Sequence, residues 1–265
     1  MLMKCLCSRL MTGVLVLVGL ALGGVANADR PIVAAASDLQ FALEEVAGQF
    51  EEDTGLSVRL NFGSSGNFRR QIAQGAPFEL YLSADEEYVL ALEREGHLVD
   101  EGVLYAIGRI VVMAPRGDPA QIVSESLEPL QERLQAGDIR RFAIANPEHA
   151  PYGVAAMEAL QSADLWDAIQ PRLVFGENVS QAARLALSGE TQGGIVAYSL
   201  ARAQRIAERS DYALIPRDQH TPLRQRMALV DGAGETARRF YQYLQGDAAR
   251  DILEHYGFAL PEDDD

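Results

Sequence analysis

Small and hydroxyl residues stand at four places where an apolar run ends and a helical pattern begins. These turns lie at residues 36–38, 63–66, 146–153 and 175–181. The first N–H groups of a helix have no partner inside it, and with the positive end of the helix dipole they attract anions. If the four helix starts face one point, the sequence predicts a site that holds a compact oxyanion through neutral donors.

Hydroxyl side chains at two of these turns could add further donors. Ser37 and Ser65 lie directly at the predicted helix starts, and Ser37 with Gln40 has the spacing of a capping box, as has Asn178 with Gln181. Such residues also cap helices for stability alone. Their position after predicted strands in both halves of the chain favours a binding role.

The elements that position these turns alternate between strand and helix. The apolar run 32–36 is followed by Leu39, Leu43, Val46 and Phe50 at helical spacing. Further strands are predicted at 56–62, 78–83, 107–114, 141–145, 173–175, 194–198, 212–215 and 225–230, and helices at 68–75, 85–95, 127–134, 152–160, 179–187, 199–208, 235–244 and 247–256. This alternation predicts an α/β protein with mostly parallel sheets flanked by helices, in which ligands bind beyond the carboxyl ends of strands.

Two lobes joined by two crossing strands are expected from the course of the chain. The punctuated loop 115–119 follows a long apolar strand, and a second round of alternation begins after it. The predicted first lobe comprises residues 29–109 and 223–265, and the second comprises 110–222. Two crossing strands would act as a hinge, and the cleft between the lobes could close on a ligand.

Residues 1–28 are typical of a secretory signal peptide. Lys4 and Arg9 precede an apolar run that ends at the small-residue cleavage pattern Ala26-Asn27-Ala28. The run is too short for a membrane helix, which needs about 20 residues. We therefore expect an exported protein with no membrane insertion after cleavage.

Composition excludes several classes of function. The net charge of −15 becomes −17 when the predicted signal peptide leaves, which argues against nucleic acid or an anionic membrane as a partner. Lys4 is the only lysine and Cys5 and Cys7 are the only cysteines, so the mature chain would have no lysine or thiol chemistry. The four histidines show no metal-ligand spacing.

Several of these segments, taken in order, resemble the periplasmic molybdate-binding proteins of ABC importers. The matching segments are 34–37, 62–66, 70–77, 82–85, 146–153, 176–179, 194–196 and 256–258. They extend over nearly all of residues 30–260. The set of segments together is more specific for this family than any single segment.

The resemblance implies a type II periplasmic-binding-protein fold and a function in binding molybdate or tungstate. Carried over by position, Ser37 and Ser65 would donate hydroxyl and backbone N–H hydrogen bonds, and Tyr152 and Val179 backbone N–H bonds. It further implies a monomeric, non-enzymatic periplasmic protein, with no cofactor beyond this ligand, that serves the membrane permease of an ABC importer.

Two positions depart from the pattern of the family. Some members place a tyrosine hydroxyl on the ligand where this chain has Ala197; the neighbouring Tyr198 would face the other way in a strand, and the Tyr152 hydroxyl could replace it. Asp38 occupies a position that is apolar or amide in other members. Its side chain could point outward and pair with the helix dipole, or it could face the ligand and accept a hydrogen bond from a protonated oxyanion such as hydrogen phosphate.

Two alternatives therefore remain beside molybdate. The protein could bind sulfate, phosphate or a small carboxylate, or it could be an exported hydrolase with Ser64 or Ser65 as nucleophile. The segment 63–66 does not fit Gly-x-Ser-x-Gly, and no histidine with a partnering acid is evident. Arg69 and Arg70 follow the serine turn, and we expect them on a solvated face.

Overall fold

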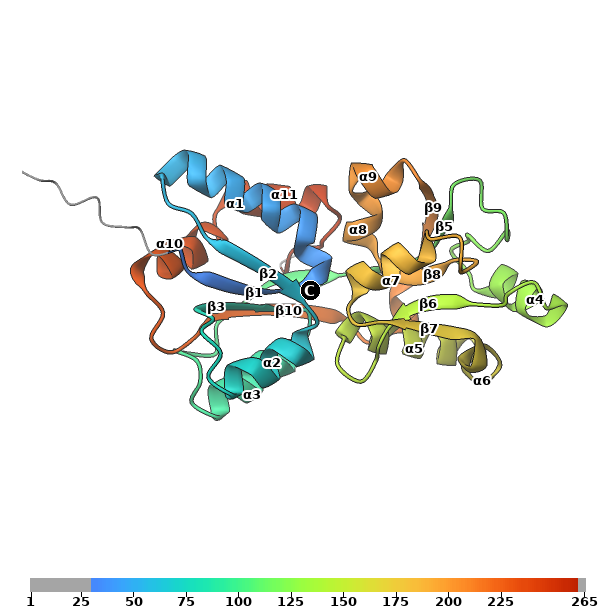
Figure 1. Cartoon of the computed structure of the whole chain (residues 1–265), viewed down its shortest axis with the longest axis horizontal. Coiled ribbons are helices and arrows are strands. Elements are labelled where there is room, and N and C mark those ends of the chain that lie inside the picture. Colours follow the sequence, from blue (N-terminus) through green and yellow to red (C-terminus); the bar gives the residue numbers. More distant parts are fainter. Residues whose placement is uncertain (1–29, 262–265) are drawn as a thin grey trace, which may run out of the picture.

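The computed structural model describes residues 30–261, which form two lobes lying side by side (Figure 1). The predicted signal peptide and the acidic residues 263–265 lie outside the described residues. Within residues 30–261, no helix is long and apolar enough to cross a bilayer.

Lobe 1 contains the elements of the first sheet and the helices packed on it. They are β1 (Ile32–Ala36), the 3-10 helix η1 (Ser37–Leu39), α1 (Gln40–Thr54), β2 (Arg59–Gly63), α2 (Ser65–Ala73), β3 (Leu80–Ser83), α3 (Glu86–Arg94), β4 (Val103–Gly108), β10 (Leu223–Leu229), α10 (Glu235–Tyr243) and α11 (Asp247–His255). Lobe 2 contains β5 (Ile110–Pro115), α4 (Glu128–Ala136), β6 (Phe142–Ala145), α5 (Pro151–Ser162), α6 (Trp166–Ile169), η2 (Gln170–Arg172), β7 (Leu173–Gly176), α7 (Val179–Ala186), β8 (Gly194–Ala197), α8 (Tyr198–Arg202), α9 (Gln204–Ala207), β9 (Ser210–Leu214) and η3 (Arg217–Gln219).

Each lobe is built on a mixed five-stranded sheet. The strand orders are β2-β1-β3-β10-β4 and β7-β6-β8-β5-β9. In each sheet one strand is antiparallel to both of its neighbours, β10 in lobe 1 and β5 in lobe 2. Each of these two strands is the first one after the chain crosses from the other lobe. The expected α/β architecture of two lobes is confirmed.

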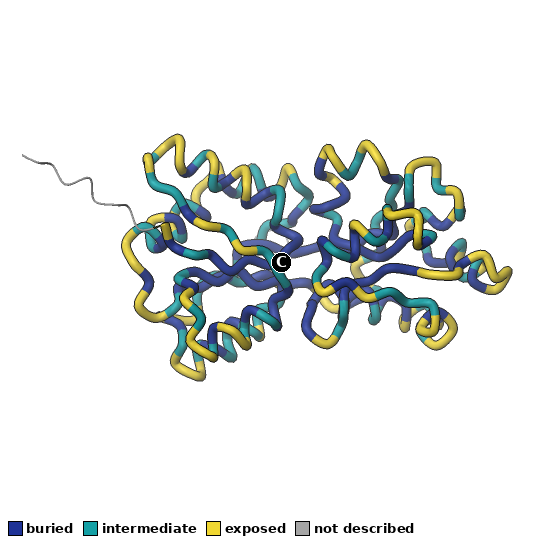
Figure 2. Tube along the Cα trace, viewed as in Figure 1, coloured by how far each residue is buried: buried dark blue, intermediate teal, exposed yellow. Residues whose placement is uncertain are grey.

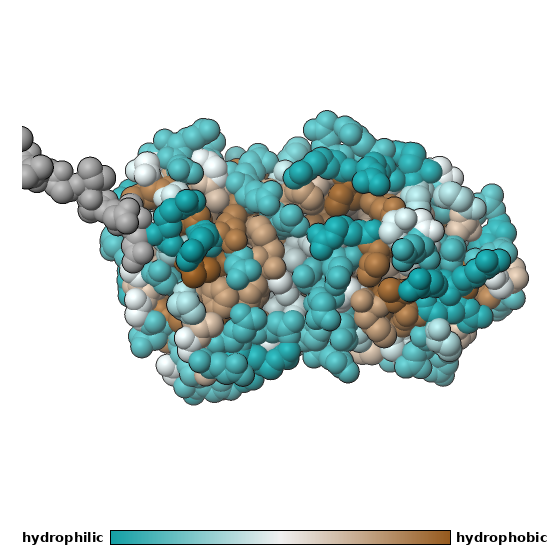
Figure 3. Space-filling view, viewed as in Figure 1, coloured by the Kyte–Doolittle hydropathy of each residue, from teal (hydrophilic) through white to brown (hydrophobic). Residues whose placement is uncertain are grey.

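The core of each lobe lies between its sheet and its helices. The strands β1, β3, β5, β6 and β8 are mostly buried and dark blue in Figure 2, whereas the outer turns of the helices are exposed. In lobe 1 the apolar stripe of α1 packs on this core, and the ring centroid of Phe50 lies 5.0 Å from that of Phe240 in α10. On the face drawn in Figure 3, hydrophilic residues cover most of the outer helices. This arrangement directs the carboxyl ends of β1 and β2 toward lobe 2.

Three predicted elements differ from the structure. The predicted strand 107–114 is two strands, because the chain passes from the first sheet to the second at Arg109. The predicted helix 199–208 is broken at Ala203, whose backbone is extended. Ser37 does not cap α1; it begins the short helix η1, and α1 starts at Gln40 without a side-chain cap.

Candidate functional site

A small cavity of about 10 Å³ lies where the two lobes meet. Lobe 1 lines it with Ala36, Ser37, Asp38, Gly63, Ser64, Ser65 and Ala84, and lobe 2 with Ala150, Pro151, Tyr152 and Val179. All four residues predicted as ligand donors are therefore brought to one cavity. None of its lining residues within the described range is a lysine, arginine or histidine.

The hydroxyl groups of Ser37 and Ser65 are oriented by backbone donors. The Ser65 oxygen accepts a hydrogen bond from the Ala84 N–H at 3.0 Å, and the Ser37 oxygen accepts one from the Ser180 N–H at 3.3 Å. A hydroxyl has one hydrogen to donate as well as lone pairs to accept. Neither hydroxyl donates a hydrogen bond to any described residue, so both hydroxyl hydrogens are available to a ligand in the cavity.

Backbone N–H groups from lobe 2 complete the donor set. Tyr152 follows Pro151 in the first turn of α5, and the N-cap residue Ala150 has no side chain that could accept its N–H. Val179 is the first residue of α7, where the Asn178 side chain accepts from Gln181 N at 3.0 Å and leaves the Val179 N–H free of the cap. First-turn N–H groups have no acceptor within their helix, so both can donate to an anion.

Asp38 points inward, and the interpretation that its side chain faces outward is wrong. The residue is 1% exposed, and its Oδ2 accepts hydrogen bonds from the Tyr152 hydroxyl at 3.0 Å and from Gln225 Nε2 at 2.7 Å. Burial is the largest influence on its acidity and raises the pKa of the Asp38 carboxyl to about 6, although the two hydrogen bonds lower it. The Tyr152 hydroxyl therefore donates to Asp38, in contrast to the expectation that it could serve the ligand.

The two other candidate side chains have different surroundings. Ser64 lines the cavity, and its Oγ lies 2.9 Å from Nδ1 of His149 in the other lobe. Tyr198 does not line the cavity. It is the first residue of α8 instead of the end of a strand, and its ring packs edge-on against Tyr212 and beneath the Arg202 guanidinium.

Arg69 and Arg70 are also away from the cavity, as expected. The Arg69 guanidinium pairs with Glu95, and that of Arg70 contacts the Asn67 side chain.

Buried polar contacts hold the lobes together around the cavity. The Ser180 and Ser199 hydroxyls donate to the backbone oxygens of Ser37 and Asp38 at 2.7 and 2.8 Å. The Gly66 N–H donates to the His149 carbonyl at 2.9 Å. The lobes thus meet through short-range, directional contacts that could form and break in a hinge motion.

Gly66 makes one of the hydrogen bonds between the two lobes, and we predict that Gly66→Ala weakens ligand binding about fivefold. A methyl group there would lie 2.8 Å from the His149 carbonyl oxygen, so the interlobe hydrogen bond, worth about 1 kcal/mol, could not form. Calorimetric titration with molybdate measures the loss. Gly48→Ala is the control, because no atom lies within 4 Å of the added methyl group; equal affinity of the two variants would contradict the prediction.

Several residues of this network were not predicted from the sequence. They are Tyr105, His149, Ser180, Ser199 and Gln225, of which Tyr105 donates to Gln225 Oε1 at 2.7 Å. One signal was available: Leu223, Gln225 and Met227 occupy every second position of β10, and all three are buried. A polar side chain at an inward strand position requires buried partners.

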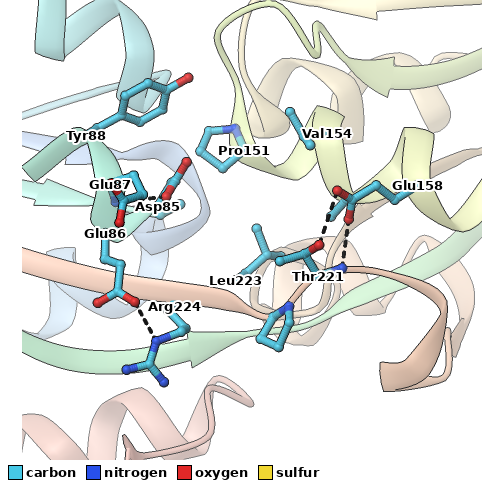
Figure 4. Close-up of a pocket in the computed structure, with 13 residues that line it drawn as sticks. Asp85, Glu86, Glu87, Tyr88, Pro151, Val154, Glu158, Thr221, Leu223 and Arg224 are labelled. Carbon is cyan, nitrogen blue, oxygen red and sulfur yellow. Dashed lines mark hydrogen bonds and ion pairs between the residues drawn. The ribbon is translucent and has the colours of Figure 1, made fainter. Parts of the chain in front are cut away.

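A larger interlobe cavity, about 360 Å³, has a lining that does not suit an anion. Figure 4 shows Asp85, Glu86 and Glu87 on one side and Glu158 on the other. The one cation drawn there, Arg224, pairs with Glu86 at 2.6 Å. Within residues 30–261, no group of three or more histidine, cysteine, aspartate or glutamate side chains could hold a metal ion.

The fold and the position of the cavity define a two-lobed binding protein of the type II periplasmic-binding-protein class. The chain belongs to the family of bacterial extracellular solute-binding proteins, whose model matches residues 32–259.

Individual relatives cover almost the whole chain. It is 33% identical to the molybdate-binding protein ModA of Rhodobacter capsulatus, over 93% of this chain and 94% of that protein. It is also 33% identical to ModA of Escherichia coli K12, over 91% and 93% of the two chains. The structure of the periplasmic molybdate-binding protein of Azotobacter vinelandii matches with a TM-score of 0.79 and 29% identity, over 88% of this chain and 100% of that chain.

Proposed function

We propose that the protein captures molybdate or tungstate in the cavity between its lobes and delivers it to the membrane permease of an ABC importer. It would act as a monomer in the periplasm, after removal of residues 1–28, without a cofactor and without catalysis. The relatives named above support the choice of ligand, since two of them are molybdate-binding proteins by name at 33% identity.

The observation that carries the proposal is the convergence of neutral donors from both lobes. Two hydroxyl groups, of Ser37 and Ser65, and two first-turn N–H groups, of Tyr152 and Val179, border one cavity. Neutral donors in a water-poor site stabilise a bound oxyanion without a countercharge. Because donors come from both lobes, a bound anion would hold the lobes together.

The small size of the cavity bears on selectivity. A volume of about 10 Å³ is close to the least that holds one water molecule. A tetrahedral oxyanion is larger, so its binding requires the lining groups to move outward. The final size of the site then decides between molybdate and the smaller sulfate.

Calorimetric titration of the ligand-free protein tests the proposal. We expect molybdate and tungstate to bind with one anion per chain and with similar affinity, because the two anions have nearly equal size. Sulfate and phosphate should bind at least tenfold more weakly, which corresponds to about 1.4 kcal/mol. Tighter binding of sulfate or phosphate than of molybdate would contradict the proposed ligand.

The contact between Ser64 and His149 is the one observation that favours the alternative function, a serine hydrolase. The His149 Nε2 lies 3.6 Å from the Glu177 carboxylate, so Ser64, His149 and Glu177 form a serine–histidine–acid series of contacts. The Glu177 side chain is 74% exposed, however, and a solvated acid orients a histidine poorly. Incubation with p-nitrophenyl esters should give no turnover above that of Ser64→Ala; steady turnover lost in that variant would overturn the binding proposal.

A further inference from the structure

One oxygen of the Asp38 carboxyl group has no hydrogen-bond partner. Oδ2 accepts from both Tyr152 and Gln225, whereas Oδ1 is buried and makes no hydrogen bond to any described residue. Asp38 also lines the cavity. The backbone N–H groups of Asp38 and Leu39 also lower the pKa of this carboxyl. Because both side-chain donors serve Oδ2, Oδ1 is the carboxyl atom that remains for a ligand.

An ionised Asp38 carboxylate would place a negative charge next to a negatively charged ligand at the proposed site. Molybdate is a doubly negative ion that only accepts hydrogen bonds, and an ionised carboxylate is likewise an acceptor. The two would repel each other in a buried cavity, where solvent screens little. A protonated carboxyl would instead present a hydrogen to the anion. The neutral form is within reach near neutral pH, since burial raises the pKa of Asp38 to about 6.

The groups that face Asp38 do not supply a compensating cation. Tyr152 of α5 contacts it directly, and Tyr105 of β4 stands behind Gln225 of β10. Burial raises the pKa of both tyrosines, so both remain neutral below pH 9. The helices α7 and α8 present the uncharged Ser180 and Ser199.

The remaining neighbours of Asp38 are uncharged as well. Gly63 of β2, Ser64 and Ser65 line the same cavity, and Gln40 begins α1. His149 lies one contact further away, behind Ser64. The largest influences on the pKa of Asp38 come from burial, Gln225, Tyr152 and the backbone of residues 38 and 39, and none of these is an arginine or a histidine.

We propose that Asp38 couples capture of the oxyanion to uptake of one proton. The carboxylate takes a proton from solvent, and the resulting O–H at Oδ1 donates to an oxygen of the bound dianion. This inference rests on the proposed function, since it needs a ligand without a proton of its own. An oxyanion that carries a proton, such as hydrogen phosphate, would require the ionised carboxylate and would show the opposite dependence on pH.

The affinity for molybdate between pH 6 and pH 8.5 tests the coupling. We expect the Kd of the unchanged protein to rise with pH, approaching tenfold per pH unit above pH 7, because each binding event then has to draw one proton from solvent. In Asp38→Asn the side-chain oxygen can accept from Tyr152 and Gln225, and its NH₂ group can donate at every pH. Its Kd should stay constant within about twofold and be lower than that of the unchanged protein at pH 8.

Two further variants identify the titrating group. Asp85→Asn removes another carboxyl whose pKa is raised by burial but which does not line this cavity, and it should keep the pH dependence. His149→Gln, which replaces the ring that contacts Ser64, should also keep it. A constant Kd in the unchanged protein would overturn the proposal. So would a pH dependence that persists in Asp38→Asn or disappears in His149→Gln.

Proton counting gives an independent readout. Calorimetry at pH 8 in two buffers of different ionisation enthalpy should report about one proton taken up per molybdate by the unchanged protein and none by Asp38→Asn. Tight binding of molybdate without proton uptake would overturn the coupling and leave the proposed function intact. Absence of molybdate binding in both proteins at every pH would overturn both.

Discussion

Replacing Ser37 and Ser65 together with alanine is expected to abolish measurable molybdate binding. Each variant removes one hydroxyl donor to a charged ligand, and such a hydrogen bond contributes about 1.5 to 3 kcal/mol. Each alanine should therefore weaken binding roughly ten- to hundredfold. If the two act independently, the double variant loses about 10² to 10⁴ in affinity. Calorimetric titration with molybdate measures the affinity of the two single variants and of the double variant.

The same substitutions leave the Ala84 and Ser180 N–H groups without their side-chain acceptors. Thermal unfolding should therefore accompany each titration, to separate lost binding from lost folding. Ser188→Ala is a matched control, because Ser188 is exposed at the end of α7 and its hydroxyl donates to the Leu185 carbonyl. Full affinity in the double variant would remove both serines from the binding site.

Asp38→Asn is expected to stabilise the ligand-free protein at pH 8 and not at pH 4. The folded state holds the pKa of this carboxyl at about 6, above its ordinary value of 3.8. The stability that this raised pKa provides is complete below about pH 4 and is lost as the pH rises through 6. Above that pH the buried carboxylate destabilises the fold by about 3 kcal/mol, which the amide avoids.

Thermal unfolding at the two pH values measures this effect. For a chain of this size we expect the Tm of Asp38→Asn to exceed that of the unchanged protein by on the order of 5 to 10 °C at pH 8. Asp53→Asn should not gain stability at pH 8, because hydrogen bonds from Tyr243 and Gln49 lower the pKa of that exposed carboxyl. An equal gain for Asp38→Asn at pH 4 would refute the explanation by ionisation.

Local sequence patterns predicted most of the elements, because helices and strands bury one face at a regular spacing. The strand at 173–175 and the helix at 179–187 nearly coincide with β7 and α7. The patterns failed where two sheets meet. Residues 107–114 are apolar except for Gly108 and Arg109, and nothing local indicates that the two halves of this run join different sheets.

The candidate site was predicted only in part, because some of its contacts join residues that are far apart in the sequence. Ser65 was indicated by the start of a helix after a strand, which is a local feature of the sequence, whereas Tyr152 and Val179 were inferred from the resemblance to molybdate-binding proteins. The orientation of Asp38 depends on Tyr152 and Gln225, which lie 114 and 187 residues further along the chain. A local pattern cannot indicate such partners, and a helix-dipole interpretation of Asp38 was equally consistent with the sequence alone.

The position of β10 between β3 and β4 affects the order in which the two sheets can form during synthesis. All strands of the second sheet lie between Ile110 and Leu214, whereas the first sheet needs β10, which begins at Leu223 and separates β3 from β4. During synthesis the second sheet can therefore assemble while the first is still split into two pieces. Lobe 1 therefore begins first along the chain and is completed last. A chain interrupted before Leu223 would leave the edges of β3 and β4 unpaired, and such edges promote aggregation.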